Sequence, residues 1–264
     1  MMTPRAWLGV AVALGAGVAC HEDLGPFVPM KWGLVTLDHQ DVAGSDYTRP
    51  EALFFSSVSS PTLSGRGATD VCGRFPYPPP PDDQPIDEIS AGPSVTVDIE
   101  GTEHTLVPAT VGNRQAYTIP QPGVEYTPGD SVEVRIPGAT DGFPEMTIRG
   151  QTAEPFTLGT IETDAAPGGL TVTWSPAGND SSRMVMSLQY HVEPGQGSGL
   201  NEQVFCTLRD DGSYTIPRVH VAGWTLAEGA RRVQAVRWRT VLETEGDALL
   251  YFVSTYSVTK STFP

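Results

Sequence analysis

Apolar and polar residues alternate in several short segments of the chain. In 95–99 every second residue is apolar, and 132–136 repeats the pattern. A period of two with one apolar face indicates a half-buried antiparallel strand. Similar strand-forming runs, rich in Val, Thr, Ile and Tyr, occupy 31–37, 52–58, 184–190, 204–209, 213–216, 233–242 and 249–258.

Glycine and proline are frequent, with 28 and 24 residues respectively. Both residue types interrupt helices, so the segments between them leave no room for long helices. No amphipathic helical pattern is visible after residue 19. The predicted fold class is therefore all-β, built from antiparallel strands.

Two pairs of predicted strands flank turn sequences. Asp210-Asp211-Gly212 separates 204–209 from 213–216, and a charged segment separates 233–242 from 249–258. Acidic residues followed by Gly favour tight turns between antiparallel strands. We expect both pairs to form hairpins, the second of which closes the sheet of a C-terminal domain.

The segment 169–176 reads Gly-Leu-Thr-Val-Thr-Trp-Ser-Pro and is followed by a polar loop and the strand at 184–190. This arrangement resembles the second strand and its successor in a fibronectin type III domain. The resemblance implies that Trp174 is buried and that the fold is a fibronectin-like or immunoglobulin-like β-sandwich. It covers a small part of the chain, and the pattern is permissive.

The length of 264 residues favours two domains of sandwich size. Prolines are dense between Pro76 and Pro85, and such a run cannot lie inside a sheet. The residues before it are too few for a core of their own, so we interpret 76–93 as a long loop. We predict β-sandwich domains at 27–155 and 156–264, with this loop in the first.

The N-terminus has the pattern of an export signal. Arg5 supplies a positive charge, and an apolar run made almost wholly of Ala, Val, Leu and Gly extends from residue 6 to 18. The run is shorter than the roughly 20 residues that a helix needs to cross a bilayer. We expect residues 1–19 to be a cleaved signal peptide.

The end of this signal, Gly17-Val18-Ala19-Cys20, resembles the lipobox of bacterial lipoproteins. The resemblance implies that Cys20 is lipidated, that 20–26 is a tether, and that acyl chains hold the protein on a membrane. Gly17 stands where the family usually has Leu, so an ordinary cleavage after Ala19 is the alternative. Because His21 rather than Asp follows the cysteine, the resemblance favours the outer membrane of the cell envelope.

Export would place Cys72 and Cys206 in an oxidising compartment, where they form a possible disulfide. If Cys20 carries lipid, these two cysteines remain to pair with each other. The bond would join the two proposed domains. Two buried thiols are the alternative.

The chain is acidic, with 31 Asp and Glu against 16 Lys and Arg. A protein of this charge is repelled by the phosphate backbone of nucleic acids. Nucleic acid is therefore excluded as a partner.

The sequence contains no motif for catalysis or metal binding. The five histidines are scattered, and no Gly-x-Ser-x-Gly elbow is present. Zinc spacings such as Cys-x-x-Cys are absent, and the acidic cluster at 82–88 does not fit a calcium-binding loop. We predict no enzyme, no cofactor and no metal. A hydrolase whose residues meet only in space is the least favoured alternative.

Arg237 and Arg239 share one face of a predicted strand, and Val236 and Trp238 lie on the other. The two arginines are candidates for contact with an anion or an acidic partner. Ion pairs with carboxylates on an adjoining strand are the alternative. Trp238 is a candidate for stacking on a sugar.

Together these patterns predict a non-enzymatic lipoprotein of the bacterial envelope that binds another envelope protein or supports an assembly. The prediction depends on an analogy of fold and on the missing catalytic motifs. A glycan-binding surface lipoprotein is the alternative.

Overall fold

The computed structural model describes residues 30–42, 45–57, 68–78, 87–119, 123–125, 127–161, 168–178, 181–192, 199–227 and 230–261. Side chains are described throughout these ranges except at 40–47. The predicted signal peptide, Cys20, the tether at 20–26 and residues 79–86 of the Pro-rich loop lie outside the described residues.

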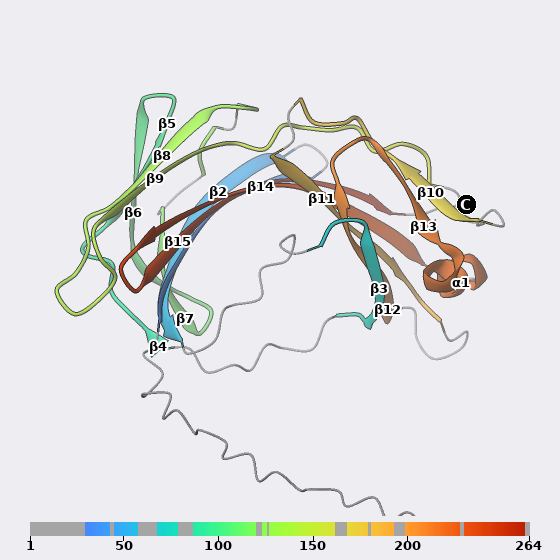
Figure 1. Ribbon diagram of the computed structural model, residues 1–264, viewed down its shortest axis with the longest axis horizontal. Coiled ribbons are helices and arrows are strands. Elements are labelled where there is room, and N and C mark those ends of the chain that lie inside the picture. The colour runs from blue at the N-terminus through green and yellow to red at the C-terminus, as the bar shows by residue number, and fades with distance from the viewer. Residues whose placement is uncertain are drawn as a thin grey trace, which may run out of the picture.

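Strands dominate the described residues, which confirms the all-β fold class (Figure 1). Within these residues, a 13-stranded sheet has the order β3-β12-β11-β14-β15-β1-β2-β7-β6-β5-β8-β9, with β4 paired to β2. Its strands are β1 (Met30–Val42), β2 (Ser45–Ser57), β3 (Val71–Pro76), β4 (Asp87–Glu88), β5 (Val95–Ile99), β6 (Thr102–Val111), β7 (Arg114–Thr118), β8 (Ser131–Ile136), β9 (Met146–Gln151), β11 (Ser182–Tyr190), β12 (Glu202–Arg209), β14 (Arg231–Glu245) and β15 (Ala248–Ser261). The strands β10 (Gly169–Thr173) and β13 (Ser213–Pro217) form a separate two-stranded sheet.

The long strands β1, β2, β14 and β15 arch across the middle of the molecule (Figure 1). β14 and β15 form the predicted C-terminal hairpin, but they lie in the centre of the sheet because β15 also pairs with β1 in parallel. β3 likewise pairs with β12. The sheet therefore continues across the predicted boundary between residues 155 and 156.

The predicted hairpin of β12 and β13 is wrong. The turn at Asp210-Asp211-Gly212 is present, but it carries the chain from the large sheet to the small one, where β13 pairs with β10. Ile216 and Leu170 face each other there and are both buried. The turn residues predict a reversal of direction, and the packing of these apolar side chains decides which sheet receives the strand.

The sequence shows no amphipathic helical pattern, but the described residues include one short helix. α1 (Arg218–Leu226) packs Val221 and Trp224 into the core, three positions apart on one helical face. Arg231 supports its C-terminal end by donating from Nε to the carbonyl oxygen of Trp224 at 3.1 Å. Among the described residues no helix is long and apolar enough to cross a membrane.

One face of the large sheet, the core face, carries two separate hydrophobic cores. Alternate residues of β14 show the change from one to the other: Val233 and Ala235 belong to the second core, and Val241 packs against the first. Between them lie the buried Arg237 and Arg239. β5, β8 and β9 cover the first core, and β10, β13 and α1 cover the second.

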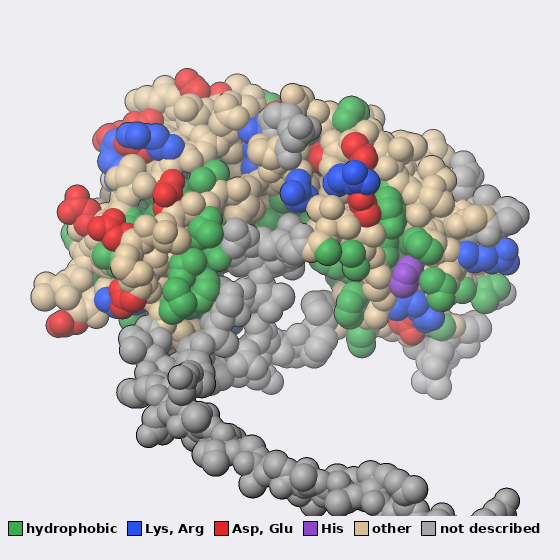
Figure 2. Space-filling model, viewed as in Figure 1, with side chains coloured by type: hydrophobic (Ala, Val, Ile, Leu, Met, Phe, Trp, Pro, Cys, Tyr) green, Lys and Arg blue, Asp and Glu red, His purple; other side chains and the backbone are tan. Residues whose placement is uncertain are grey.

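The opposite face of the sheet, the groove face, carries the other set of alternating side chains. Below the arch the surface is hollowed between the two halves of the molecule (Figure 2). A third, smaller apolar cluster lies on the groove face around Trp32 and Tyr251. The long strands thus take part in packing on both of their faces.

Candidate binding groove

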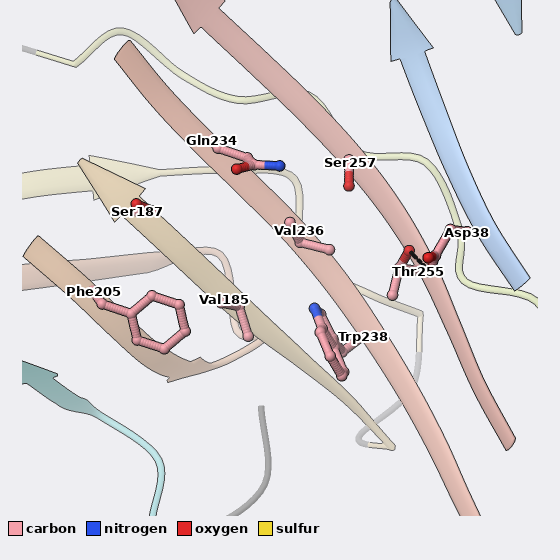
Figure 3. Close-up of a pocket in the computed structure, with 9 residues that line it drawn as sticks. All are labelled: Asp38, Val185, Ser187, Phe205, Gln234, Val236, Trp238, Thr255 and Ser257. Carbon is pink, nitrogen blue, oxygen red and sulfur yellow. Dashed lines mark hydrogen bonds between the residues drawn. The ribbon is translucent and has the colours of Figure 1, made fainter. Parts of the chain in front are cut away.

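A groove of about 280 Å³ lies on the groove face where β1, β11, β12, β14 and β15 run side by side (Figure 3). A volume of this size is at the lower end of that of small-molecule pockets. Its lining combines two aromatic rings, two valines and five polar side chains, which are Asp38, Val185, Ser187, Phe205, Gln234, Val236, Trp238, Thr255 and Ser257.

Strand register brings these residues together from distant parts of the sequence. Val185 of β11 lies opposite Val236 of β14, and Val236 lies opposite Ser257 of β15. One row further along, Trp238 lies opposite Thr255, which lies opposite Asp38 of β1. Alternation within each strand then points all of these side chains to the same face.

Trp238 and Phe205 supply the aromatic surface of the groove (Figure 3). The Trp238 indole Nε1 is buried, and it has no hydrogen-bond partner among the described residues. Because this nitrogen is not accessible, the ring rather than the N–H is the surface that Trp238 offers to a ligand. Trp238 is half-buried rather than a fully exposed platform.

Two polar groups of the groove are also without partners. The Gln234 amide and the Ser257 hydroxyl make no hydrogen bond to any described residue, and both line the groove (Figure 3). An amide offers two donors and an acceptor, and a hydroxyl offers one donor and an acceptor. This part of the groove can therefore hydrogen-bond to a ligand without breaking hydrogen bonds between described residues.

A buried polar network adjoins the groove at its Gln234 end. Ser187 Oγ donates to Gln203 Oε1 at 2.7 Å, and Gln189 Nε2 donates to Ser187 Oγ at 3.0 Å. Gln189 Oε1 in turn accepts a 2.5 Å hydrogen bond from Nε of Arg232. Arg232 and Gln234 are two positions apart on β14, so both side chains point to the groove face.

Arg232 is held by neutral groups only. Besides Gln189, its guanidinium donates to the Tyr77 hydroxyl and lies over the Tyr77 ring at 5.4 Å from the centroid. Among the described residues it forms no ion pair. Arg232 does not line the groove itself, but it follows Gln234 on the same face of β14 and is a positioned cation whose charge is not neutralised within the described part of the chain.

The opposite end of the groove face is apolar. Trp32 of β1 and Tyr251 of β15 stack with ring centroids 6.1 Å apart and planes inclined by 4°. Trp32 Nε1 is a second buried indole nitrogen, and none of the residues that the structure describes forms a hydrogen bond with it. The polarity of the face thus changes from Arg232 at one end to this aromatic pair at the other.

Asp38 lies at the edge of the groove and accepts a 2.8 Å hydrogen bond from the Thr255 hydroxyl. Its surface is exposed to solvent, but the protein around the carboxylate removes enough water to raise its pKa. The hydrogen bond from Thr255 acts in the opposite direction and is the smaller effect.

Arg237 and Arg239 do not lie on the surface, so they do not form the anion-binding stripe considered from the sequence. Arg237 Nε is 2.6 Å from Asp210 Oδ2, with both side chains almost fully buried, and Arg239 is paired with Glu154. The two carboxylates come from loops rather than from the adjoining strand. Both arginines therefore form ion pairs, which is the alternative considered from the sequence, and their carboxylate partners lie in loops.

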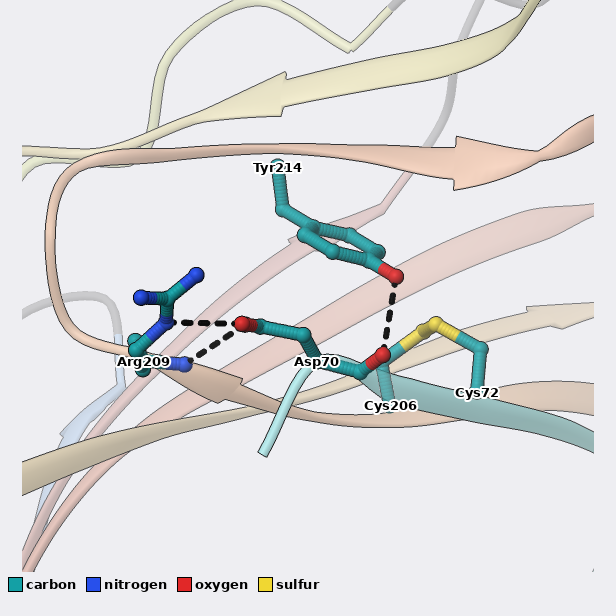
Figure 4. Close-up of a disulfide and its surroundings, with 5 residues drawn as sticks. All are labelled: Asp70, Cys72, Cys206, Arg209 and Tyr214. Carbon is teal, nitrogen blue, oxygen red and sulfur yellow. Dashed lines mark hydrogen bonds and ion pairs between the residues drawn. A yellow bond between two sulfur atoms is a disulfide. The ribbon is translucent and has the colours of Figure 1, made fainter. Parts of the chain in front are cut away.

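Cys72 and Cys206 are joined by a disulfide with an S–S distance of 2.07 Å (Figure 4). They occupy directly opposed positions on β3 and β12. Asp70, just before β3, accepts from Arg209 Nε at 2.7 Å, and its carbonyl oxygen accepts from the Tyr214 hydroxyl at 3.0 Å. The bond and these contacts fix the outermost strand beside the groove.

Trp174 and one of the five histidines, His39, lie away from the groove. Trp174 is buried in the second core, as the resemblance implied, and donates from Nε1 to Asp210 Oδ1 at 2.8 Å. His39 is buried, with Nδ1 2.7 Å from Thr48 Oγ1 and its ring stacked on Tyr256. Among the described residues, no three His, Cys, Asp or Glu side chains are grouped closely enough to hold a metal ion.

No protein-family model and no curated protein matches the chain. The strands, cores and groove of the structure define the chain as an all-β protein with one large sheet, two cores and a lined groove. Neither Arg232 nor Gln234 is among the site residues predicted from the sequence. The alternation of side chains along the strand could have indicated both residues. It places them on the same face as Trp238 and on the opposite face from Arg237 and Arg239.

Proposed function

We propose that this chain is a lipid-anchored lipoprotein of the bacterial cell envelope that binds another envelope protein through the groove. The anchor is Cys20, and the membrane is the outer membrane. In this proposal the protein is a non-enzymatic module that needs no cofactor. The two halves remain candidates for fibronectin-like or immunoglobulin-like sandwiches that share the central strands.

The observation that carries the binding function is the unused hydrogen-bonding capacity beside an aromatic surface. The Gln234 amide and the Ser257 hydroxyl have no partners among the described residues, and the rings of Trp238 and Phe205 lie in the same groove. Protein-binding sites typically combine a buried aromatic residue with polar groups that are satisfied on binding. An anchor would hold such a site at the membrane surface.

Site-specific photo-crosslinking in intact producing cells tests this proposal. A photoreactive phenylalanine analogue replaces Phe205 in the groove or, as a matched control, Val219 on the exposed face of α1. We expect a discrete protein adduct from position 205 and none of that size from position 219. The same adduct from both positions, or none from either, contradicts binding through the groove.

The anchor is tested separately in the same cells. Incorporation of an alkyne-labelled palmitate is expected in the native chain and lost in Cys20→Ser. Loss of the anchor should also weaken the adduct at position 205, because it lowers the local concentration at the membrane. Palmitate label in the Cys20→Ser chain contradicts lipidation at this residue.

Glycan binding is the second candidate, and the specific observation for it is Trp238 beside amide, hydroxyl and carboxyl groups in one groove. Sugars stack on aromatic rings and hydrogen-bond to groups of this kind. Binding to a glycan array that is lost in Trp238→Ala, without a protein adduct at position 205, would favour this candidate over the first.

A further inference from the structure

We propose that the groove binds the C-terminal end of an extended polypeptide, with the terminal carboxylate on Arg232 and apolar side chains against Val236, Phe205 and Trp238. The inference rests on the proposed function and names the part of the partner that the groove receives.

The first argument is the charge beside the groove. Arg232 is fixed by Gln189 and by the hydroxyl and ring of Tyr77, and it forms no ion pair among the described residues. A guanidinium matches a carboxylate with two parallel hydrogen bonds, and a guanidinium already held in place loses little freedom on binding. Arg237 and Arg239 cannot take this role, because Asp210 and Glu154 already pair with them.

The second argument is the spacing along β14. The side chains of Arg232, Gln234, Val236 and Trp238 follow one another on the groove face, each two residues after the last. From Arg232 to Trp238 this is about 20 Å, which corresponds to about six residues of an extended peptide. A peptide of that length would place its terminal group at Arg232 and an apolar residue at Trp238.

The third argument distinguishes a peptide from a fatty acid, which also has a carboxylate and an apolar body. Between the charged and aromatic ends, Gln234 and Ser257 offer free donors and acceptors. A hydrocarbon chain would leave these groups without partners, at a cost in free energy, whereas peptide N–H and C=O groups would satisfy them. The groove is therefore suited to a polar backbone with apolar side chains.

The aromatic surface continues on the β3 side of the groove. Gly73 lies opposite Phe205 across the β12–β3 pair, and the Phe75 ring occupies the space beside this glycine. A Cβ at Gly73 would lie 2.7 Å from the Phe75 ring, which leans over this glycine. Phe75 is 51% exposed and extends the aromatic surface toward solvent.

The test uses the full-length protein in nanodiscs and two pools of biotinylated hexapeptides. Both pools are randomised over Val, Ile, Leu, Phe, Thr and Ser, and they differ only in a free or an amidated C-terminus. We expect enrichment from the free pool alone, and fluorescence anisotropy of an enriched peptide should show binding weakened about tenfold or more in Arg232→Gln. Arg218→Gln, which removes an equal charge from the exposed start of α1, should bind like the native chain.

The near-UV circular dichroism of each variant checks that it is folded. Equal enrichment from both pools, or no enrichment from either, overturns this inference. Arg232-dependent binding of a fluorescent fatty acid without peptide binding also overturns it. If both pools or neither pool is enriched, the photo-adduct at position 205 would still support a protein partner. Failure of this inference is therefore distinguishable from failure of the proposed function.

Discussion

At the scale of single residues, Arg237 shows how the sheet tolerates a charge between two hydrophobic cores. Its guanidinium donates to both carboxylate oxygens of Asp210 and to the backbone carbonyls of Ser175, Pro155 and Glu154, at 2.6 to 3.2 Å. Asp210 is satisfied further by Trp174 and Ser182. Burial of an ion pair costs desolvation free energy, and this cost is offset only when the remaining donors and acceptors of the pair are hydrogen-bonded in this way.

Replacing Arg237 with Met should therefore destabilise the protein strongly. The change keeps an apolar stem but leaves Asp210 buried without its counter-charge, which costs about 3–5 kcal/mol of unfolding free energy. Urea denaturation monitored by tryptophan fluorescence measures the loss. In the double variant with Asp210→Asn the charge is removed from both partners, so it should lose less than the two single variants summed. A loss below about 1 kcal/mol in Arg237→Met would show that the pair is not important for stability.

Asp38 gives a prediction about pH. Its pKa in the folded protein is raised above the ordinary value of 3.8 by loss of surrounding water, so the folded state binds the proton more tightly than the unfolded chain does. The stability that this group contributes is thus present below pH 3.8 and is lost as the pH rises through the raised value. Asp38→Asn removes the effect. Relative to this variant, the native chain should gain stability on acidification from pH 7 to pH 3 in denaturant titrations, and a relative loss would contradict the raised pKa.

At the scale of elements, β3 depends on a covalent bond. It is short and outermost, and it is joined to β12 by the disulfide across a separation of 134 residues. Closing a loop of that length restricts the unfolded chain, and removing a native disulfide typically costs about 2–5 kcal/mol. Cys72→Ser with Cys206→Ser should lose this amount in urea denaturation. The native chain in dithiothreitol should approach the same value, and equal stability with and without reductant would contradict the prediction.

Comparison of the predicted strands with the observed ones shows which elements a local sequence pattern can predict. Alternation located β5 and β8, and the turn sequence after residue 242 located the β14–β15 hairpin, because these signals act between neighbours in the sequence. β13 leaves its hairpin partner and α1 forms because Ile216, Val221 and Trp224 fill the second core. That core is built from residues far apart in the chain, so no local pattern reveals it.

The candidate groove was predictable only in part, for the same reason. Trp238 was recognised from its residue type and its face. Its neighbours Thr255 and Asp38 reach it through the parallel pairing of β15 with β1. The spacing of residues within either strand does not reveal that a strand near the start of the chain pairs with one near its end. The contact between Arg232 and Tyr77 is likewise not visible in the sequence.

At the scale of the whole molecule, the sheet joins the two halves that the sequence suggested as domains. β1 and β15 pair over eleven positions, from Lys31 opposite Ala248 to Asp41 opposite Val258. The disulfide adds a covalent link between β3 and β12. The two cores also share β14 and β15, so unfolding of either half exposes part of the other.

This arrangement predicts that 27–155 and 156–264 do not fold as separate proteins. Without β14 and β15 the first fragment loses Leu250 and Phe252 from its core, and without β1 and β3 the second fragment exposes both edges of its part of the sheet. Each fragment alone should show no cooperative thermal transition and should aggregate, because unpaired strand edges template association. The intact chain should unfold in a single transition by calorimetry. Two separate transitions, each reproduced by one fragment, would instead establish independent domains and would place the shared strands at an ordinary interface between them.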